Sequence, residues 1–261
     1  MMVNALRRHW PEYLMEAAGL GIFMVSAGLF GTLLEYPQSP VNQAIADPLL
    51  RRFLMGLAMG LTAVAIIYSP WGQQSGAHLN PAVTLTFLRL GKVAFPDAVF
   101  YIIAQFAGGI LGVILVSVAL GNSFADHPVS YVVTVPGTSG VLVAFLAEMV
   151  ISFGLMLMVL FTTNTTELSR YTGVFAGVLL VVYITFEAPL SGMSINPART
   201  LASALPAGLW TALWVYFTAP IIGMLLASVF YQVTRGLGKV KCAKLNHHTG
   251  RRCIFHCGYR T

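Results

Sequence analysis

Two short stretches of this chain are alike, with five of eight residues identical, and each opens an apolar segment too short to cross a membrane. Residues 75–82 read SGAHLNPA, and residues 191–198 read SGMSINPA, 116 positions later. As helices, the apolar segments 80–90 and 196–205 would each cover about 15 Å, about half of the hydrocarbon core of a bilayer. Neither can cross a membrane alone, so each must enter it and stop among other parts of the protein.

Six other apolar segments are long enough to cross a bilayer as helices. They are residues 11–34, 52–68, 98–120, 141–161, 171–186 and 209–232. With 57% hydrophobic and 9% charged residues over 261 positions, the composition is that of an integral membrane protein. We therefore predict an all-α membrane protein with six transmembrane helices and two re-entrant half-helices.

The two halves of the chain form an internal repeat. A glycine spacing that lets helices approach closely recurs in both halves. It is found at Gly56, Gly60, Gly173 and Gly177. The repeats cover about residues 11–120 and 141–235, and each holds three spans and one half-helix. Because three is odd, the second repeat enters from the opposite face, which predicts a 3+3 inverted repeat.

The positions of the charges predict the orientation. If residues 1–10 are cytoplasmic, so is the tail 236–261, and 12 of the 15 Lys and Arg lie on the cytoplasmic side; the exceptions are Arg51, Arg52 and Arg199. This distribution follows the positive-inside rule. The net charge of +6 is not gathered into a basic stripe, so we expect no nucleic-acid partner.

An Asn-Pro pair begins each half-length segment. Asn80 and Asn196 can cap a helix whose first position is proline. If the two half-helices dip from opposite faces, their N-termini meet near the middle of the bilayer. Irregular backbone at that depth lines a wet path or is buried, so residues 72–79 and 189–195 should line a pore. Two facing helix N-termini place a positive potential there, which repels cations and protons.

These paired motifs resemble those of the major intrinsic protein family, the aquaporins and glycerol facilitators, over about residues 11–235. The resemblance assigns six residues to the pore motifs: Asn80, Pro81, Ala82, Asn196, Pro197 and Ala198. It implies a passive channel that is not an enzyme and uses no cofactor. It further implies a bacterial-type homotetramer in a lipid bilayer that passes water and small neutral solutes. The absence of a targeting peptide fits the inner membrane of a bacterium.

The resemblance also implies an outer selectivity filter. Its arginine would be Arg199, which stands in an apolar segment, where a cation is costly and usually functional. Spacing from Asn196 places two other filter positions on Ile184 and Met193. The fourth position is either Gly60 or Met59, and an uncertainty of one residue in the alignment leaves both open.

The filter departs from that of strictly water-selective members. Those members usually have His where Ile184 stands, so the gate here should be more apolar and wider. Other positions oppose a glycerol facilitator: Thr200 replaces the Asp of that subgroup, Ala204 is small rather than basic, and Tyr216-Phe217 resembles the aromatic pair of water channels. We expect water as a substrate. A glycerol or urea facilitator with little water selectivity stays open as the alternative, and a secondary transporter ranks below both.

Three further polar residues have candidate roles. In the family, carboxylates at the positions of Glu16 and Glu148 accept hydrogen bonds from the re-entrant loops, whereas the alternative is a charge at a helix end. His78 is a candidate for the wall of the cytoplasmic vestibule, and a histidine satisfied within its loop is the alternative.

The tail is rich in potential ligands for soft metals. They are Cys242, His247, His248, Cys253, His256 and Cys257. Their spacing matches no standard zinc finger, and Lys and Arg intervene throughout. We therefore expect a basic, mostly disordered cytoplasmic segment near anionic lipid, without a structural disulfide, and assign no metal to it. A zinc site or a redox sensor stays open as the alternative.

Overall fold

Six long helices form the body of the molecule. The computed structural model describes residues 1–247 and 250–259, and this part of the chain contains helices and no strand. The six are α1 (Met2–Glu35), α3 (Pro48–Tyr68), α6 (Phe95–Leu120), α8 (Val141–Thr163), α9 (Thr172–Phe186) and α12 (Leu213–Arg235). Each is long and apolar enough to cross a membrane, α9 together with the turn η2 (Ser169–Tyr171) before it. The predicted all-α membrane fold is confirmed.

Two shorter helices follow the Asn-Pro pairs, as predicted. They are α5 (Pro81–Arg89) and α11 (Pro197–Ala207). The remaining short elements are connectors: α2 (Pro40–Ala44), α4 (Pro70–Ser75), α7 (Asn122–Ala125), η1 (Ser130–Val132) and α10 (Ala188–Ser191). The half-helices stop early because Gly91 and Gly208, which adopt positive φ angles of 69° and 63°, turn the chain back at their ends.

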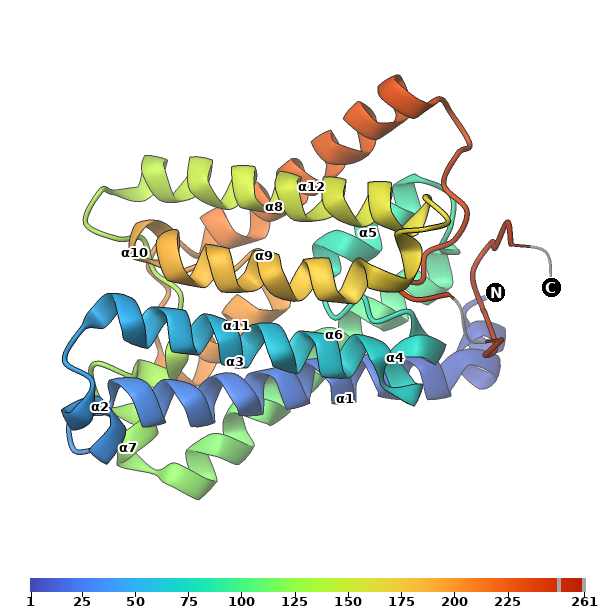
Figure 1. Cartoon of the computed structure of the whole chain (residues 1–261). Coiled ribbons are helices and arrows are strands. Elements are labelled where there is room, and N and C mark those ends of the chain that lie inside the picture. Colours follow the sequence, from blue (N-terminus) through green and yellow to red (C-terminus); the bar gives the residue numbers. More distant parts are fainter. Residues whose placement is uncertain (248–249, 260–261) are drawn as a thin grey trace.

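The packing of the helices repeats between the two halves. In the first half α1 packs along α6, and in the second half α8 packs along α12, while α3 and α9 face each other across the join. Figure 1 shows these long helices side by side, with α5 and α11 between them. Half-helix α5 contacts α12, and α11 contacts α6, so each half-helix packs on the third span of the other repeat. The body is one bundle rather than two separable halves.

Both ends of the described chain lie on one face of the bundle, which we call the terminal face. The Arg252 guanidinium of the tail donates to the Arg8 carbonyl oxygen at 2.7 Å. In Figure 1 the start of α1 and the tail lie at one end, and α2, α7 and α10 lie at the other. Helix α1 begins at Met2, earlier than the predicted span, since its first turns project beyond the apolar segment. There the His9 ring and the Tyr13 hydroxyl both contact the buried Asp97 carboxylate.

Glycine allows the long helices to touch. A Cβ on Gly108 of α6 would overlap the Ala17 carbonyl of α1, and one on Gly60 of α3 would lie 2.6 Å from the Gly177 oxygen of α9. The neighbouring Ala107, by contrast, is exposed on the outer surface. The outer surface of α6 is apolar, with Ile103 and Leu115 more than half exposed, as expected of helices that face lipid.

We predict that Gly108→Val destabilises the bundle, because the added side chain must push α1 away from α6. Overpacking of this kind costs about 1–3 kcal/mol. Thermal unfolding of the purified protein in detergent should show a lower melting temperature for Gly108→Val. The matched variant Ala107→Val adds two methyl groups on the lipid side of the same turn and should melt like the parent. Equal melting of the two variants would contradict the packing described here.

Candidate functional site

The two half-helices begin with the same cap. The Asn80 Oδ1 atom accepts a hydrogen bond from the Ala82 amide at 2.8 Å, and the Asn196 Oδ1 atom accepts one from the Ala198 amide at 3.0 Å. Proline at the first helical position of each has no N–H that would need a partner. Each cap satisfies a backbone donor that would otherwise be left unpaired at the helix start.

The two caps are also bonded to each other's loops. The Asn80 side-chain nitrogen donates to the Ile195 carbonyl at 2.7 Å, and the Asn196 nitrogen donates to the Leu79 carbonyl at 2.8 Å. Each acceptor is the residue before the other asparagine, so the half-helices meet tip to tip. An amide nitrogen carries two hydrogens, so each asparagine keeps one for a solute.

A buried carboxylate holds the first loop from behind. Glu16 of α1 has no exposed surface. It accepts the His78 amide at 3.0 Å, the Leu79 amide at 2.6 Å and the Ser75 hydroxyl at 2.8 Å. The Gln105 side chain of α6 donates to it as well, at 2.9 Å. Glu16 is therefore placed as the resemblance implied for a loop-supporting residue, and not at a helix end in contact with water.

Glu148 of α8 does the same for the second loop. It accepts the Ser194 amide at 2.6 Å, the Ile195 amide at 2.7 Å and the Ser191 hydroxyl at 2.7 Å, and it too is fully buried. Both loops contain non-glycine residues at positive φ. They are Ala77, Leu79, Met193 and Ile195, at φ angles from 51° to 55°. The carboxylates stabilise this backbone conformation, because each accepts the amides of two consecutive loop residues.

One cavity of about 340 Å³ passes between the half-helices. At the face opposite the terminal face it is lined by Glu35 and Arg52, and at the terminal face by His78 and the tail residue Leu245. Asn80 and Asn196 line it between these ends. Most of the remaining wall is apolar, so the few polar groups fix where a solute can form hydrogen bonds.

Arg199, Ile184 and Met193 all line this cavity. The Arg199 Nη1 atom is buried and has no hydrogen-bond partner among the described residues. Of the two candidates for the fourth filter position, Met59 lines the cavity. The Gly60 alternative is wrong, because that residue faces α9, where a Cβ would lie 2.6 Å from the Gly177 oxygen.

His78 lines the cavity at the terminal face and is almost wholly buried. Its Nδ1 atom lies 3.1 Å from the Thr84 hydroxyl, and its Nε2 atom lies 2.8 Å from the Ala243 carbonyl of the tail. The ring therefore belongs to the wall and is also satisfied by neighbours, so both sequence interpretations describe part of its environment. The tail covers it, which the sequence did not suggest.

Sequence reasoning missed the cavity wall contributed by α1. Leu20, Phe23 and Ala27 line the cavity from that helix, as do Met55 and Ala63 from α3. Helical spacing could have identified these residues, since positions three and four apart share one face of a helix. That signal was weak because the opposite faces are equally apolar where they meet lipid.

Fold and site together define a membrane channel with its path inside a single chain. The comparisons then name the family: the model of the major intrinsic protein family matches residues 5–231. The chain belongs to this family of channel proteins, is an integral membrane protein and is not an enzyme. The resemblance found in the sequence is confirmed.

Similar proteins include plant aquaporins. The chain is 34% identical over 180 residues to aquaporin NIP1-3 of Oryza sativa subsp. japonica, covering 69% of this chain and 59% of that protein. It is 37% identical over 174 residues to aquaporin NIP6-1 of Arabidopsis thaliana, covering 66% and 55%. The chain thus spans less than two thirds of either relative. Among solved structures, the aquaglyceroporin of Plasmodium falciparum shares the fold, with a TM-score of 0.70, 20% identity, and coverage of 85% and 95%.

We predict that Glu148→Gln weakens the second loop. An amide has only one oxygen to accept with, so either the Ser194 or the Ile195 amide loses its acceptor. A buried unsatisfied donor costs about 1–3 kcal/mol. The melting temperature in detergent and the water permeability in proteoliposomes should both fall. Glu167→Gln, an equal change at an exposed carboxylate, is the control and should alter neither. Parent-like behaviour of Glu148→Gln would show that the loop does not depend on this carboxylate.

Proposed function

We propose that this chain is a passive channel for water and small neutral solutes that excludes ions and protons. The observation that supports this most directly is the tip-to-tip meeting of α5 and α11, with Asn80 and Asn196 each bonded to the opposite loop and lining the cavity. A solute oxygen at this point meets two amide donors at once. A water molecule that accepts from both is turned so that it cannot pass a proton along a continuous chain.

Charge exclusion has two sources. Each helix N-terminus carries the equivalent of about half a positive charge, and two such ends face the same point. Arg199 adds a full charge to the cavity wall, and its unpartnered Nη1 atom can donate to a solute. A cation would lose its hydration in a largely apolar cavity and meet positive potential at its middle, whereas a neutral solute meets donors that it can accept from.

The residues of the filter favour the passage of small neutral solutes as well as water. We assign it to Arg199, Ile184, Met193 and Met59, so that a single polar side chain stands among three apolar ones. Such a gate can contact the carbon atoms of glycerol and hydrogen-bond one side of urea. The matched relatives are named aquaporins, and the structural neighbour is named an aquaglyceroporin, which supports either substrate. A facilitator with little water selectivity is the second candidate, favoured by Ile184 where water-selective channels usually have His.

The environment of the channel is part of the proposal. The terminal face, which carries most of the Lys and Arg, lies in the cytoplasm, and the chain forms a homotetramer with one pore in each subunit. The reported sequence relatives are plant proteins, which gives no support to the bacterial inner membrane that we expected. The mechanism is the same in any bilayer.

We predict that Ile184→His lowers glycerol and urea permeation relative to water, because imidazole makes the gate more polar. Stopped-flow measurements on proteoliposomes should follow all three solutes, with Ile184→Val as a control that keeps the wall apolar. Water flux with a low temperature dependence supports a channel, whereas solute uptake that requires an ion gradient would indicate a carrier. Unchanged ratios among the three solutes in Ile184→His would contradict the placement of the filter.

We predict that Arg199→Val, which copies Val83 of the first repeat, admits small cations. A unit charge about 4 Å away is worth about 4 kcal/mol at an effective dielectric constant of 20, so cation leak should rise at least about tenfold. The readout is ion conductance in planar bilayers. Arg7→Val removes an exposed cation at the terminal face instead and serves as the control, with conductance expected at the parent level. A silent Arg199→Val channel would mean that the helix termini exclude cations without the arginine.

A further inference from the structure

The tail brings four soft ligand atoms together beside the channel. The Sγ atoms of Cys242, Cys253 and Cys257 and a ring nitrogen of His247 all lie within 4.8 Å of one another. We propose that these four residues form a tetrahedral site for a soft divalent cation, Zn²⁺, which fixes the tail across the cytoplasmic mouth of the channel. His248 lies outside the described residues and has no part in the proposal.

The geometry is close to that of an assembled zinc site. Zinc bonds to sulfur at about 2.3 Å, so two ligands of a regular tetrahedron stand about 3.8 Å apart. The Cys242 and Cys253 sulfurs are 3.6 Å apart, and the Cys257 sulfur lies 3.0 Å from the His247 Nε2 atom. Adjustments of about 1 Å would therefore complete the tetrahedron. Three cysteines and one histidine form a recognised structural zinc set.

The surroundings suit the charge of such a site. Zinc binds thiolates, so up to three thiol protons pass to solvent on binding, and Zn²⁺ with three thiolates and neutral imidazole has a net charge of −1. The buried Lys244 ammonium interacts electrostatically with all three sulfurs. It also donates to the Arg251 and Arg252 carbonyls, at 3.2 and 2.6 Å. These hydrogen bonds hold the segments on either side of the tail loop together beside the ligands.

The described part of the tail also needs an interaction that offsets the conformational entropy lost when it folds. It contains neither helix nor strand, yet Cys242, Ala243 and Leu245 are buried in it. Long segments without regular structure rarely order themselves, because few backbone hydrogen bonds offset the lost entropy. A metal that binds only the folded arrangement supplies that free energy. The expectation of a mostly disordered tail at the lipid surface is wrong for these residues.

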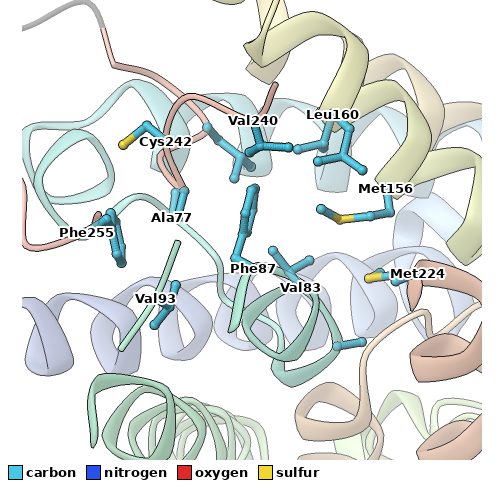
Figure 2. Close-up of a cluster of buried hydrophobic side chains, with 14 of the residues drawn as sticks. Ala77, Val83, Phe87, Val93, Met156, Leu160, Met224, Val240, Cys242 and Phe255 are labelled. Carbon is cyan, nitrogen blue, oxygen red and sulfur yellow. The ribbon is translucent and has the colours of Figure 1, made fainter. Parts of the chain in front are cut away.

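The four proposed ligand residues lie next to the channel mouth. The Leu245 amide donates to the Gly76 carbonyl at 3.1 Å, and the Phe255 ring stacks on His78 at 5.4 Å. Leu245 itself lines the cavity. Figure 2 shows Cys242 and Phe255 of the tail beside Ala77 and Phe87 of the first loop and half-helix, in one buried apolar cluster.

Further contacts spread the tail over the whole mouth. The Lys241 amide donates to the Asn164 side chain at the end of α8, at 2.6 Å, and the His256 amide donates to the Lys92 carbonyl after α5, at 2.9 Å. The tail therefore bridges both repeats. With the metal bound it narrows the mouth, and without the metal it can leave. This consequence for flow rests on the proposed channel function, whereas the metal site does not.

The metal site is tested on the purified full-length chain, reduced and freed of metal, by titration with Co²⁺ and then Zn²⁺. We expect one equivalent of Co²⁺ per chain, with thiolate charge-transfer and tetrahedral d–d absorption that Zn²⁺ abolishes. Cys257→Ser and His247→Ala should lose affinity by more than the roughly 100-fold that an outer-shell change can cost. His256→Ala is the matched control, because its ring contacts the Gly91 carbonyl instead, and should bind like the parent. A parent without this spectrum, or one whose Cys242 and Cys253 form a disulfide and leave no site, overturns the proposal.

The closing role is tested by water flux in proteoliposomes loaded with Zn²⁺ or with a chelator. We expect a larger shrinkage rate constant with the chelator for the parent and for His256→Ala, and a constantly high rate for Cys257→Ser. A normal Co²⁺ spectrum with flux indifferent to metal would refute the closing role. Absence of water and solute flux from every variant in every condition would refute the channel function instead, with the Co²⁺ spectrum still deciding the metal site.

Discussion

The structure depends on two helix N-termini that are held in contact inside the membrane. A bilayer interior offers no water to unpaired backbone groups, so a chain can stop halfway only where its own side chains satisfy them. Here Asn80 and Asn196 cap the helices and also bond the opposite loops. Glu16 and Glu148 take up the loop amides from behind. Each repeat thus completes the polar contacts of the other, which explains why the two halves form one bundle.

The same arrangement gives the cavity its chemistry. Backbone donors that are already paired with the carboxylates and caps cannot attract a solute, so a solute at the middle of the cavity finds its donors in the asparagine amides and Arg199. Most of the remaining wall is apolar and binds water weakly, which would let a neutral solute pass quickly. Positive potential from the helix ends coincides with the point where Asn80 and Asn196 line the cavity. In the proposed function, passage of neutral solutes and rejection of cations follow from one set of contacts.

Most of the fold could be predicted from the sequence because its strongest signals are local. Long apolar segments predicted the spans, and the Asn-Pro pairs predicted where the half-helices begin. The similarity of residues 75–82 and 191–198 predicted the repeat and its inversion. Side chains that face the cavity were harder to identify. Met59 and Gly60 are neighbours, and only the packing of α3 on α9 shows which one faces inward. The wall from α1 was hidden because lipid-facing and cavity-facing residues are both apolar.

The tail could not be predicted for a different reason. Its four candidate ligands are separated by irregular intervals, and their approach depends on contacts with Gly76, His78 and Asn164 that lie far away in the sequence. A rule based on the spacing of zinc ligands assumes that the segment carrying them folds by itself. In this chain the channel body provides the surface on which they gather.

In the proposed channel, the meeting point of the half-helices lets water through and stops protons. The most direct measurement records water flux and internal pH in the same proteoliposomes, under an osmotic gradient and an opposing pH gradient. The account predicts rapid shrinkage with a low activation energy while the internal pH decays no faster than in protein-free vesicles. Proton flow that rises in proportion to water flow through the intact protein would contradict it.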